Sequence, residues 1–184
     1  ILPAIKLLEE KLDIMNVDAG IDYRKKVMEQ VKAYHTPLNE EVNAQISHTF
    51  DQLAEAHDEQ DPTLHIENRK IQAIRRAGGV VWFDFKTLCC GPRSQNDYLE
   101  IASLFHTVIL SDVPYMPPKM ASEARRFTWL IDVFYDHKVK LIISAEVEAD
   151  QLYTEGQMSN EFHRTVSRII EMQSKEYLEA PRRI

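Results

Sequence analysis

The sequence predicts an α/β protein with a parallel βαβ core, flanking helices and a small β meander. Near-continuous apolar residues at Phe105–Leu110 and at Val139–Ile143 indicate two strands, and an amphipathic helix pattern lies between them. Strands that are apolar on both faces and joined by a helix are typical of a parallel sheet covered by helices. Short β-branched or aromatic runs earlier in the chain predict the meander.

The N-terminal part is expected to be mainly helical. Leu2–Leu12 places its apolar residues on one helical face, and Ile14–Val17 suggests a short strand. The pattern of Lys25–Ala33 is compatible with a helix or with a strand. Asn39 can begin a further helix that ends near His57. The apolar residues of that helix recur at steps of four, four and three: Val42, Ile46, Phe50 and Leu53.

The acidic run Asp58–Pro62 is the best boundary inside the chain, so we divide the sequence into residues 1–60 and 61–184. The expected antiparallel meander follows this run. Its three strands are Leu64–Ile66, Lys70–Ile74 and Val80–Phe85.

Three helical segments complete the second part. Lys86–Cys90 can form one turn, and Asn96 or Asp97 can cap a helix over Tyr98–Leu104. Ser122 or a neighbour is expected to cap the helix of the βαβ unit. A last helix over about Asn160–Tyr177 is expected to turn four apolar residues inward: Phe162, Val166, Ile169 and Ile170.

Composition excludes several functions for the chain as given. It has 184 residues and five glycines; no glycine precedes a lysine, and none follow the GxGxxG spacing. Phosphate loops need such glycines, so a self-sufficient nucleotide triphosphatase and a Rossmann dehydrogenase are excluded. A net charge of −7 argues against binding to nucleic acid. No apolar run approaches the ~20 residues that span a bilayer.

The first residue and the cysteines carry smaller expectations. Ile1 is not an initiator methionine and ILPAIKLLEEKL has the pattern of a helix interior, so we expect a fragment or a processed piece. The adjacent Cys89 and Cys90 are expected to be two buried thiols of a reducing compartment, since vicinal cysteines rarely pair and no histidines accompany them.

Polar residues follow both strands of the βαβ unit. Asp112 comes after the first strand and Glu146 after the second. The carboxyl ends of parallel strands share one edge, where ligands bind, so these carboxylates could hold Mg²⁺ or polarise a water. The alternative is that they cap the following turns or pair with Arg125 or Arg126.

Two arginines stand one turn apart on the last helix. Arg164 and Arg168 share a face, and like charges at this spacing repel unless an anion such as a phosphate lies between them. The alternative is neutralisation by Glu161 and Glu171, each at i,i+3 from one of the arginines.

The remaining charged or titratable residues point to no specific chemistry. Arg125 and Arg126 open a helix against its dipole, so an acidic partner such as Asp112, Glu123 or a ligand is expected. The seven histidines form no metal motif. His106 is expected in the core and His137 at a helix C-terminus, where positive charge is favourable.

The chain resembles the ZapE-type, AAA+-related ATPases of bacterial cell division and their mitochondrial lactation-elevated relatives. Four segments carry the resemblance between Gly79 and Leu178: GVVWFDFKTLC, NDYLEIASLFHTVILSDVP, EARRFTWLIDVFYDHKVKLIISAE and FHRTVSRIIEMQSKEYL. The start, LPAIKLLEEKLDIMNVDAGIDYR, is similar to the segment that follows the family's sensor strand.

This resemblance implies the C-terminal part of a P-loop ATPase-like protein. The phosphate loop and the Mg²⁺-binding acidic strand would precede Ile1, residues 1–60 would be a helical, lid-like segment, and residues 61–184 the C-terminal α/β domain. ATP and Mg²⁺ would then serve the parent protein, with no cofactor, catalytic residue or metal ligand in this fragment.

The resemblance also implies roles for individual residues. Arg164 and Arg168 match the RTxSRL/I helix and would act as sensor-two-type arginines near the γ-phosphate. Asp22 and Arg24 match a DYR element of structural role. Five further residues match the ARRF…LID…YD element and would bind a neighbouring element or a partner: Arg125, Arg126, Asp132, Tyr135 and Asp136.

Three functions follow as hypotheses. The first is the C-terminal part of an ATP-hydrolysing motor that acts on protein partners, among them division or membrane-associated proteins. Such a motor would be cytoplasmic, peripheral to the inner membrane and homo-oligomeric at full length. The second is an interaction or lid module without nucleotide chemistry. The third is a metal-dependent hydrolase that uses Asp112 and Glu146.

Overall fold

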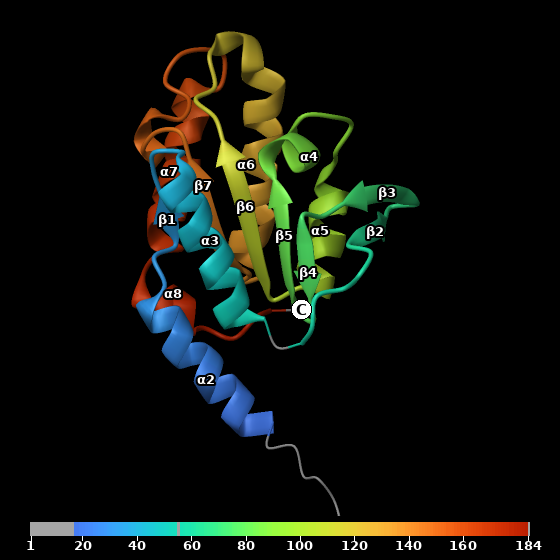
Figure 1. Cartoon of the computed structure of the whole chain (residues 1–184). Helices are drawn as coiled ribbons and strands as arrows, with labels where there is room; N and C mark the ends of the chain where they lie inside the picture. Colours follow the sequence, from blue (N-terminus) through green and yellow to red (C-terminus); the bar gives the residue numbers. More distant parts are fainter. Residues whose placement is uncertain (1–16, 55, 184) are drawn as a thin grey trace, which may run out of the picture.

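Five strands form the central sheet of the computed structural model, which describes residues 17–54 and 56–183. Their order is β1-β7-β6-β5-β4 (Figure 1). The strands are β1 (Tyr34–His35), β4 (Arg75–Ala77), β5 (Val80–Asp84), β6 (Thr107–Val113) and β7 (Lys140–Ala145). β1, β7, β6 and β5 are mutually parallel, and β4 joins β5 in the antiparallel sense.

The predicted βαβ unit is confirmed. β6 leads through α6 (Ala121–Asp136) to β7, and the two strands pair directly in parallel, with Ile109 opposite Ile142. Every residue of β7 is buried, and so is every residue of β6 except Asp112. The apolar runs on both strands arise because helices cover both faces of the sheet.

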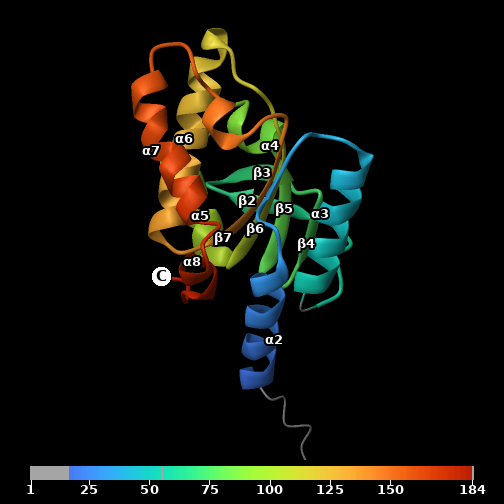
Figure 2. The ribbon, with the colours of Figure 1, turned by 90° about the vertical axis from the view of Figure 1, so that its left-hand side faces the viewer.

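The helices lie in two layers. Figure 2 shows α6 and α7 (Ser159–Glu171) on one side of the sheet and α3 (Glu40–Leu53) on the other. α5 (Gln95–Leu104) packs against α6, and α8 (Lys175–Glu179) contacts α2 (Val17–Gln30). The α/β class with a mostly parallel sheet between helices is therefore confirmed.

The N-terminal expectations have mixed outcomes. Leu2–Leu12 and the start of Ile14–Val17 lie outside the described residues, and Val17 already begins α2. The ambiguous stretch Lys25–Ala33 is helical as far as Gln30. Asn39 caps α3 as predicted, because its Oδ1 accepts the Val42 N–H at 2.8 Å.

α3 ends earlier than expected. Its last residue is Leu53, since Ala54 has an extended backbone. The four apolar residues predicted for its inner face are all buried: Val42, Ile46, Phe50 and Leu53. The division at residue 60 stays a prediction about domain organisation, but β1 pairs with β7 and α3 packs against β5, so both described parts share one core.

The expected meander is a separate hairpin plus one strand of the central sheet. β2 (Thr63–Ile66) and β3 (Arg69–Gln72) form a two-stranded antiparallel sheet. The residues between them, Glu67 and Asn68, have φ of 48° and 61°, which suits a tight hairpin turn. The three-strand prediction was wrong because β5 has β4 and β6 as its neighbours.

Several helix ends differ from the predictions. Ser94, rather than Asn96 or Asp97, caps α5, and its N–H donates to an Asp97 carboxylate oxygen at 2.6 Å. Met120 precedes α6, where Ser122 was expected, because the short helix η1 (Pro118–Met120) leads straight into it. The predicted turn near Lys86 is α4 (Phe85–Cys89).

The last predicted helix is two helices. α7 ends at Glu171, and α8 begins after Ser174, whose hydroxyl accepts the Tyr177 N–H. Phe162 and Ile169 are buried as expected, whereas Ile170 is 61% exposed. A short helix η2 (Ala149–Gln151) follows β7. None of the described helices is long and apolar enough to cross a membrane.

Candidate functional site

The arginines singled out on α7 meet the same carboxylate on α6. Arg164 Nη2 lies 3.0 Å from Asp132 Oδ2, and Arg168 Nη1 donates to Asp132 Oδ1. The anion that their spacing requires is therefore supplied from within the chain. It comes from the neighbouring helix, which neither sequence alternative considered.

An aromatic ring completes this cluster. The Arg168 guanidinium lies over the Tyr135 ring, 4.9 Å from its centroid, and the Tyr135 hydroxyl donates to Glu171 Oε2 at 2.7 Å. That hydrogen bond raises the pKa of Tyr135, because the neighbouring carboxylate disfavours the phenolate. Glu171 therefore accepts a hydrogen bond from Tyr135. The predicted Arg168–Glu171 pair is not among the ion pairs of the described residues.

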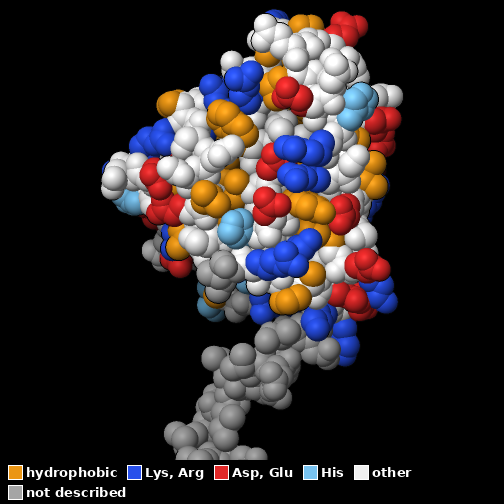
Figure 3. All heavy atoms as spheres, turned by 180° about the vertical axis from the view of Figure 1, so that it is seen from behind, with side chains coloured by type: hydrophobic (Ala, Val, Ile, Leu, Met, Phe, Trp, Pro, Cys, Tyr) orange, Lys and Arg blue, Asp and Glu red, His pale blue; other side chains and the backbone are white. Residues whose placement is uncertain are grey.

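Exposure separates the two arginines. The Arg164 side chain is 66% exposed, whereas those of Arg168 and Asp132 are each 22% exposed. Arg164 can therefore leave Asp132 at little cost, since exposed ion pairs contribute only about 0–1 kcal/mol. Figure 3 shows the α6 and α7 face, over which acidic and basic side chains interleave. Whether either arginine reaches a nucleotide stays a prediction.

The remaining residues of the family elements are dispersed. Arg126 Nη1 donates to the Cys89 carbonyl at 3.1 Å, which ties α6 to α4. Arg125 and Asp136 are exposed on α6. Asp22 lies in α2, with a side chain outside the described part, and Arg24 of the same helix is partly buried. Their assignment to partner binding or to structure stays a prediction.

The two carboxylates predicted to pair at the sheet edge have separate neighbours. Glu146 Oε2 accepts the Tyr115 N–H at 3.0 Å, so it caps a turn, as the alternative expected. Asp112 has φ of 61°, and its N–H donates to Ser144 Oγ at 3.0 Å. Burial raises the pKa of Asp112, and the Asp84 carboxylate adds to this effect.

No metal site emerges from this edge. Asp84 and Asp112 line a hollow of about 400 Å³ together with Lys86 and Cys90. Asp84 also caps α4, because its Oδ1 accepts the Thr87 N–H at 2.7 Å. Across the described residues, no three His, Cys, Asp or Glu side chains gather closely enough to hold a metal ion.

The cysteines and histidines have structural surroundings. Cys89 is fully buried, which raises the pKa of its thiol, but Cys90 is exposed, so the prediction of two buried thiols was wrong for Cys90. His106 Nδ1 lies 2.8 Å from Thr107 Oγ1 beside the core. His137 follows the last turn of α6, as predicted, and its Nδ1 lies 3.1 Å from the Arg183 carbonyl.

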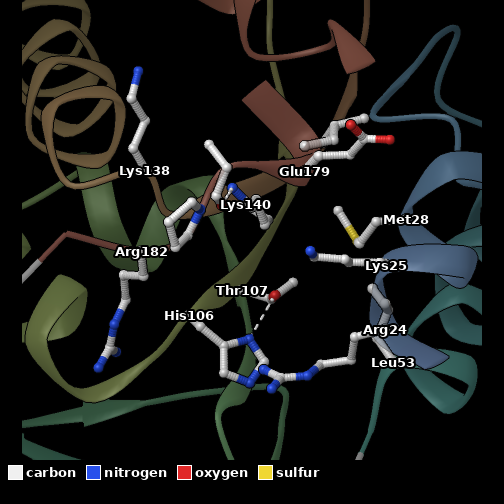
Figure 4. A pocket seen from close by; sticks show the side chains of 13 residues that line it. Arg24, Lys25, Met28, Leu53, His106, Thr107, Lys138, Lys140, Glu179 and Arg182 are labelled. Carbon is white, nitrogen blue, oxygen red and sulfur yellow. Dashed lines mark hydrogen bonds between the residues drawn. The ribbon is translucent and has the colours of Figure 1, made fainter. Parts of the chain in front are cut away.

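A second hollow lies at the opposite edge of the sheet, and sequence reasoning missed it. It has a volume of about 470 Å³ and lies at the start of β6 and β7, against α2 and the chain after α8 (Figure 4). Its lining includes Arg24, Lys25, His106 and Lys140. The sequence did contain a signal for this hollow. Lys138 and Lys140 lie on either side of Val139, the first residue of the predicted apolar strand Val139–Ile143.

Comparison with known proteins agrees with this architecture. The model of the AFG1-like ATPase family matches residues 1–181. The cell division protein ZapE of Escherichia coli K12 is 44% identical over 177 residues, which cover 96% of this chain and 47% of ZapE. No solved structure matches the chain significantly.

More distant relatives show the same partial coverage. Lactation elevated protein 1 homolog B of Danio rerio is 33% identical over 96% of this chain and 42% of its own length. A Schizosaccharomyces pombe protein of uncharacterized function is 31% identical over 98% of this chain and 46% of its own. The chain thus spans about half the length of these curated relatives.

A mostly parallel sheet between two helical layers defines an α/β protein, and this arrangement is consistent with a P-loop ATPase-like fold. The match to a family model identifies the family within this class. The chain belongs to the AFG1-like ATPase family.

Proposed function

We propose that this chain is the C-terminal part of an ATP-hydrolysing, AAA+-like protein that acts on protein partners in cell division. One observation carries the proposal: 96% of the chain aligns with ZapE, a cell division protein, but covers only 47% of it. The remaining length of such a protein provides room for the phosphate loop that this sequence lacks.

The loop that follows β1 at the carboxyl edge of the described sheet does not fit the phosphates of a nucleotide. β1 leads into α3 through residues 36–39, which contain neither glycine nor lysine. Glu40 and Glu41 occupy the first turn of α3, where their carboxylates would repel a phosphate. This supports binding of ATP and Mg²⁺ by a part of the protein outside this chain.

In this proposal, Arg164 and Arg168 face the nucleotide held by that other part. Asp132 would hold both guanidinium groups in place until a γ-phosphate oxygen competes for them, since Arg forks suit carboxylate and phosphate alike. The exposure of Arg164 makes it the arginine that can change partner.

ATP turnover by the longer protein tests the proposal. Replacing Arg164 and Arg168 together by Ala should lower kcat about tenfold or more, because each guanidinium stabilises developing phosphate charge. The control is Arg183→Ala, which removes an exposed guanidinium but keeps the backbone bonds to His137. Turnover that matches the control in the double variant would exclude the sensor role.

The second candidate function is an interaction or lid module without nucleotide chemistry. It is favoured by Glu40 and Glu41 at the sheet edge and by Arg125, exposed on α6. This candidate predicts that the 184-residue chain itself does not bind ATP in the presence of Mg²⁺, which isothermal titration calorimetry of the chain measures. Micromolar binding of ATP would exclude it.

A further inference from the structure

The hollow at the amino ends of β6 and β7 lies away from the edge at which α/β sheets usually bind ligands. Four parts of the chain surround it: α2, the end of α3 at Leu53, the starts of the two strands, and residues 178–182. Its volume of about 470 Å³ falls in the range of small-molecule sites. The hollow therefore has the size of a ligand site that is separate from the carboxyl edge.

Positive charge converges on this hollow from opposite walls. In Figure 4, the Lys25 side chain extends from α2 toward the centre, and Lys140 lies across from it at the start of β7. The Arg24 side chain, which comes from α2 like that of Lys25, extends toward the His106 ring. Lys138 also lines the hollow, but its amine points away from the others.

Carboxylates do not balance the two central amines. Lys140 Nζ donates to the carbonyls of Tyr177 and Ala180, at 2.6 and 2.5 Å, and both acceptors are neutral. Lys25 makes no ion pair with another described residue. Glu179 is the carboxylate in the lining, and its Oε1 lies 3.7 Å from Lys175 Nζ. This excess of positive charge stands out in a chain whose net charge is −7.

Lys140 makes this arrangement costly without a ligand. The residue is only 9% exposed. Two carbonyls and the Tyr177 ring, whose centroid lies 4.9 Å from Nζ, partly compensate its charge, but burying an ammonium group away from an anion is still unfavourable. A second cation across the hollow increases this cost. An anion between the two amines would remove both penalties, as anions do where cations converge in partly buried sites.

The other walls of the hollow are apolar. Met28, Leu53 and Leu178 line it, and all three are at least nine-tenths buried. Ligand sites commonly combine such apolar walls with a few placed charges. A bare inorganic ion would use the charges but would bury none of the apolar surface that these side chains still present to the hollow.

We infer that this hollow binds a small organic phosphate monoester, with the phosphate between Lys25 and Lys140 and the organic group against Met28, Leu53 and Leu178. A phosphate monoester carries about −1.5 to −2 charges near pH 7, which matches two ammonium groups better than a single carboxylate. The site lies apart from Arg164 and Arg168 and operates independently of the proposed ATP chemistry.

Isothermal titration calorimetry of the 184-residue chain tests this site with hexyl phosphate as the probe. Hexyl phosphate should bind at least about fivefold more tightly than inorganic phosphate, because burial of its chain adds about 0.8 kcal/mol per CH₂ removed from water. Equal affinities for the two probes would overturn the assignment of the apolar wall, and no binding at millimolar concentration would overturn the site.

A matched pair of lysine variants locates the binding. Lys25→Gln should weaken hexyl phosphate binding about tenfold, since it removes one of the two charges at the phosphate. Lys119→Gln removes an exposed lysine at the other end of the molecule and should leave the affinity unchanged. Equal affinities of the two variants would overturn the site. Lys140 is buried, and a variant such as Lys140→Met can fail to fold. Lys25 is exposed, so Lys25→Gln tests the site without this risk.

Vesicles separate a soluble ligand from a lipid headgroup with the same chemistry. Phosphatidic acid presents a phosphate monoester, and phosphatidylcholine vesicles serve as the control. Binding to phosphatidic acid vesicles without binding to soluble hexyl phosphate would overturn the small-molecule assignment. Binding to hexyl phosphate that Lys25→Gln weakens supports it.

Discussion

Arg164 and Asp132 form an ion pair between α7 and α6, with 3.0 Å between Nη2 and Oδ2. Arg168 donates to the other oxygen of the same carboxylate. One acidic side chain therefore neutralises two arginines that would otherwise repel each other across one helical turn. The same contact joins α7 to the βαβ unit, in addition to the buried Phe162 and Ile169.

Removal of Asp132 should loosen this helix pair. Asp132→Ala is expected to lower the free energy of unfolding by about 1 kcal/mol, because two partly exposed ion pairs are lost and the arginines then repel. Asp136→Ala, one turn further on α6 and exposed, should change it by less than about 0.5 kcal/mol. Urea unfolding of the chain measures both; equal losses would show that Asp132 has no special role.

Asp97 should be one of the more sensitive polar positions in the chain. Its side chain is fully buried and accepts hydrogen bonds from Arg69 Nη2, at 2.6 and 2.7 Å, and from the Ser94 N–H. Asp97→Ala should cost about 2–4 kcal/mol, because it detaches the β2–β3 hairpin from α5 and removes a helix cap.

The neighbouring exposed Asn96 provides the control for Asp97. Asn96→Ala should alter the midpoint of urea unfolding little, since the side chain lies in water. A small effect of Asp97→Ala would instead mean that the hairpin docks on α5 without this ion pair.

Gly79 should tolerate no side chain. A Cβ at this position would lie 2.4 Å from His106 Cδ2, and the Gly79 carbonyl accepts the N–H groups of His106 and Thr107. Gly79→Ala should therefore cost about 1–3 kcal/mol by overpacking. Gly91→Ala meets nothing within 4 Å and should be nearly neutral. Thermal unfolding midpoints that coincide for the two variants would refute this.

Lys140 should make stability rise with pH. Burial lowers its pKa to about 8, and repulsion from Lys138 adds to this effect. Lys25, His106, Glu179 and Arg182 are the other titratable or charged groups that line the same hollow, apart from Arg24 and Lys138. Between the folded pKa near 8 and the unfolded value of 10.5, the unfolded chain binds more protons, so the free energy of unfolding increases with pH.

Between pH 7 and pH 9.5, the size of this effect is on the order of 2 kcal/mol. Urea unfolding at pH 7 and pH 9.5 measures it as the difference between the original chain and Lys140→Met, which cancels the titration of groups common to both. The free energy of unfolding of Lys140→Met relative to that of the original chain should be highest at pH 7 and lower at pH 9.5, because the original chain alone gains stability as Lys140 loses its proton. A constant difference between the two proteins would contradict the lowered pKa.

Local patterns in the sequence were sufficient for the core of the fold. The βαβ unit was predictable because β6 and β7 are buried on both faces and leave no polar alternation. The role of Asn39 as the cap of α3 was predictable because a helix cap involves residues only three positions apart, here Asn39 and Val42. β1 was not, since Tyr34–His35 is extended only through its parallel pairing with β7, more than 100 residues away.

The candidate site shows the same division between local and distant contacts. The need for an anion beside Arg164 and Arg168 follows from helical spacing, but Asp132 meets them only through the packing of α6 on α7. Ile170 was expected inside because it lies four residues after Val166 in the apolar pattern. The buried face of α7 instead contains Phe162, Thr165 and Ile169, Val166 is only partly buried, and Ile170 is exposed.

Steady-state ATP hydrolysis by the longer protein that contains this chain, compared with the 184-residue chain itself, tests the central proposal most directly. The proposal predicts Mg²⁺-dependent turnover by the longer protein and none by the chain, because residues 36–41 do not fit a nucleotide's phosphates. Turnover by the 184-residue chain, or its absence from the longer protein, would contradict it.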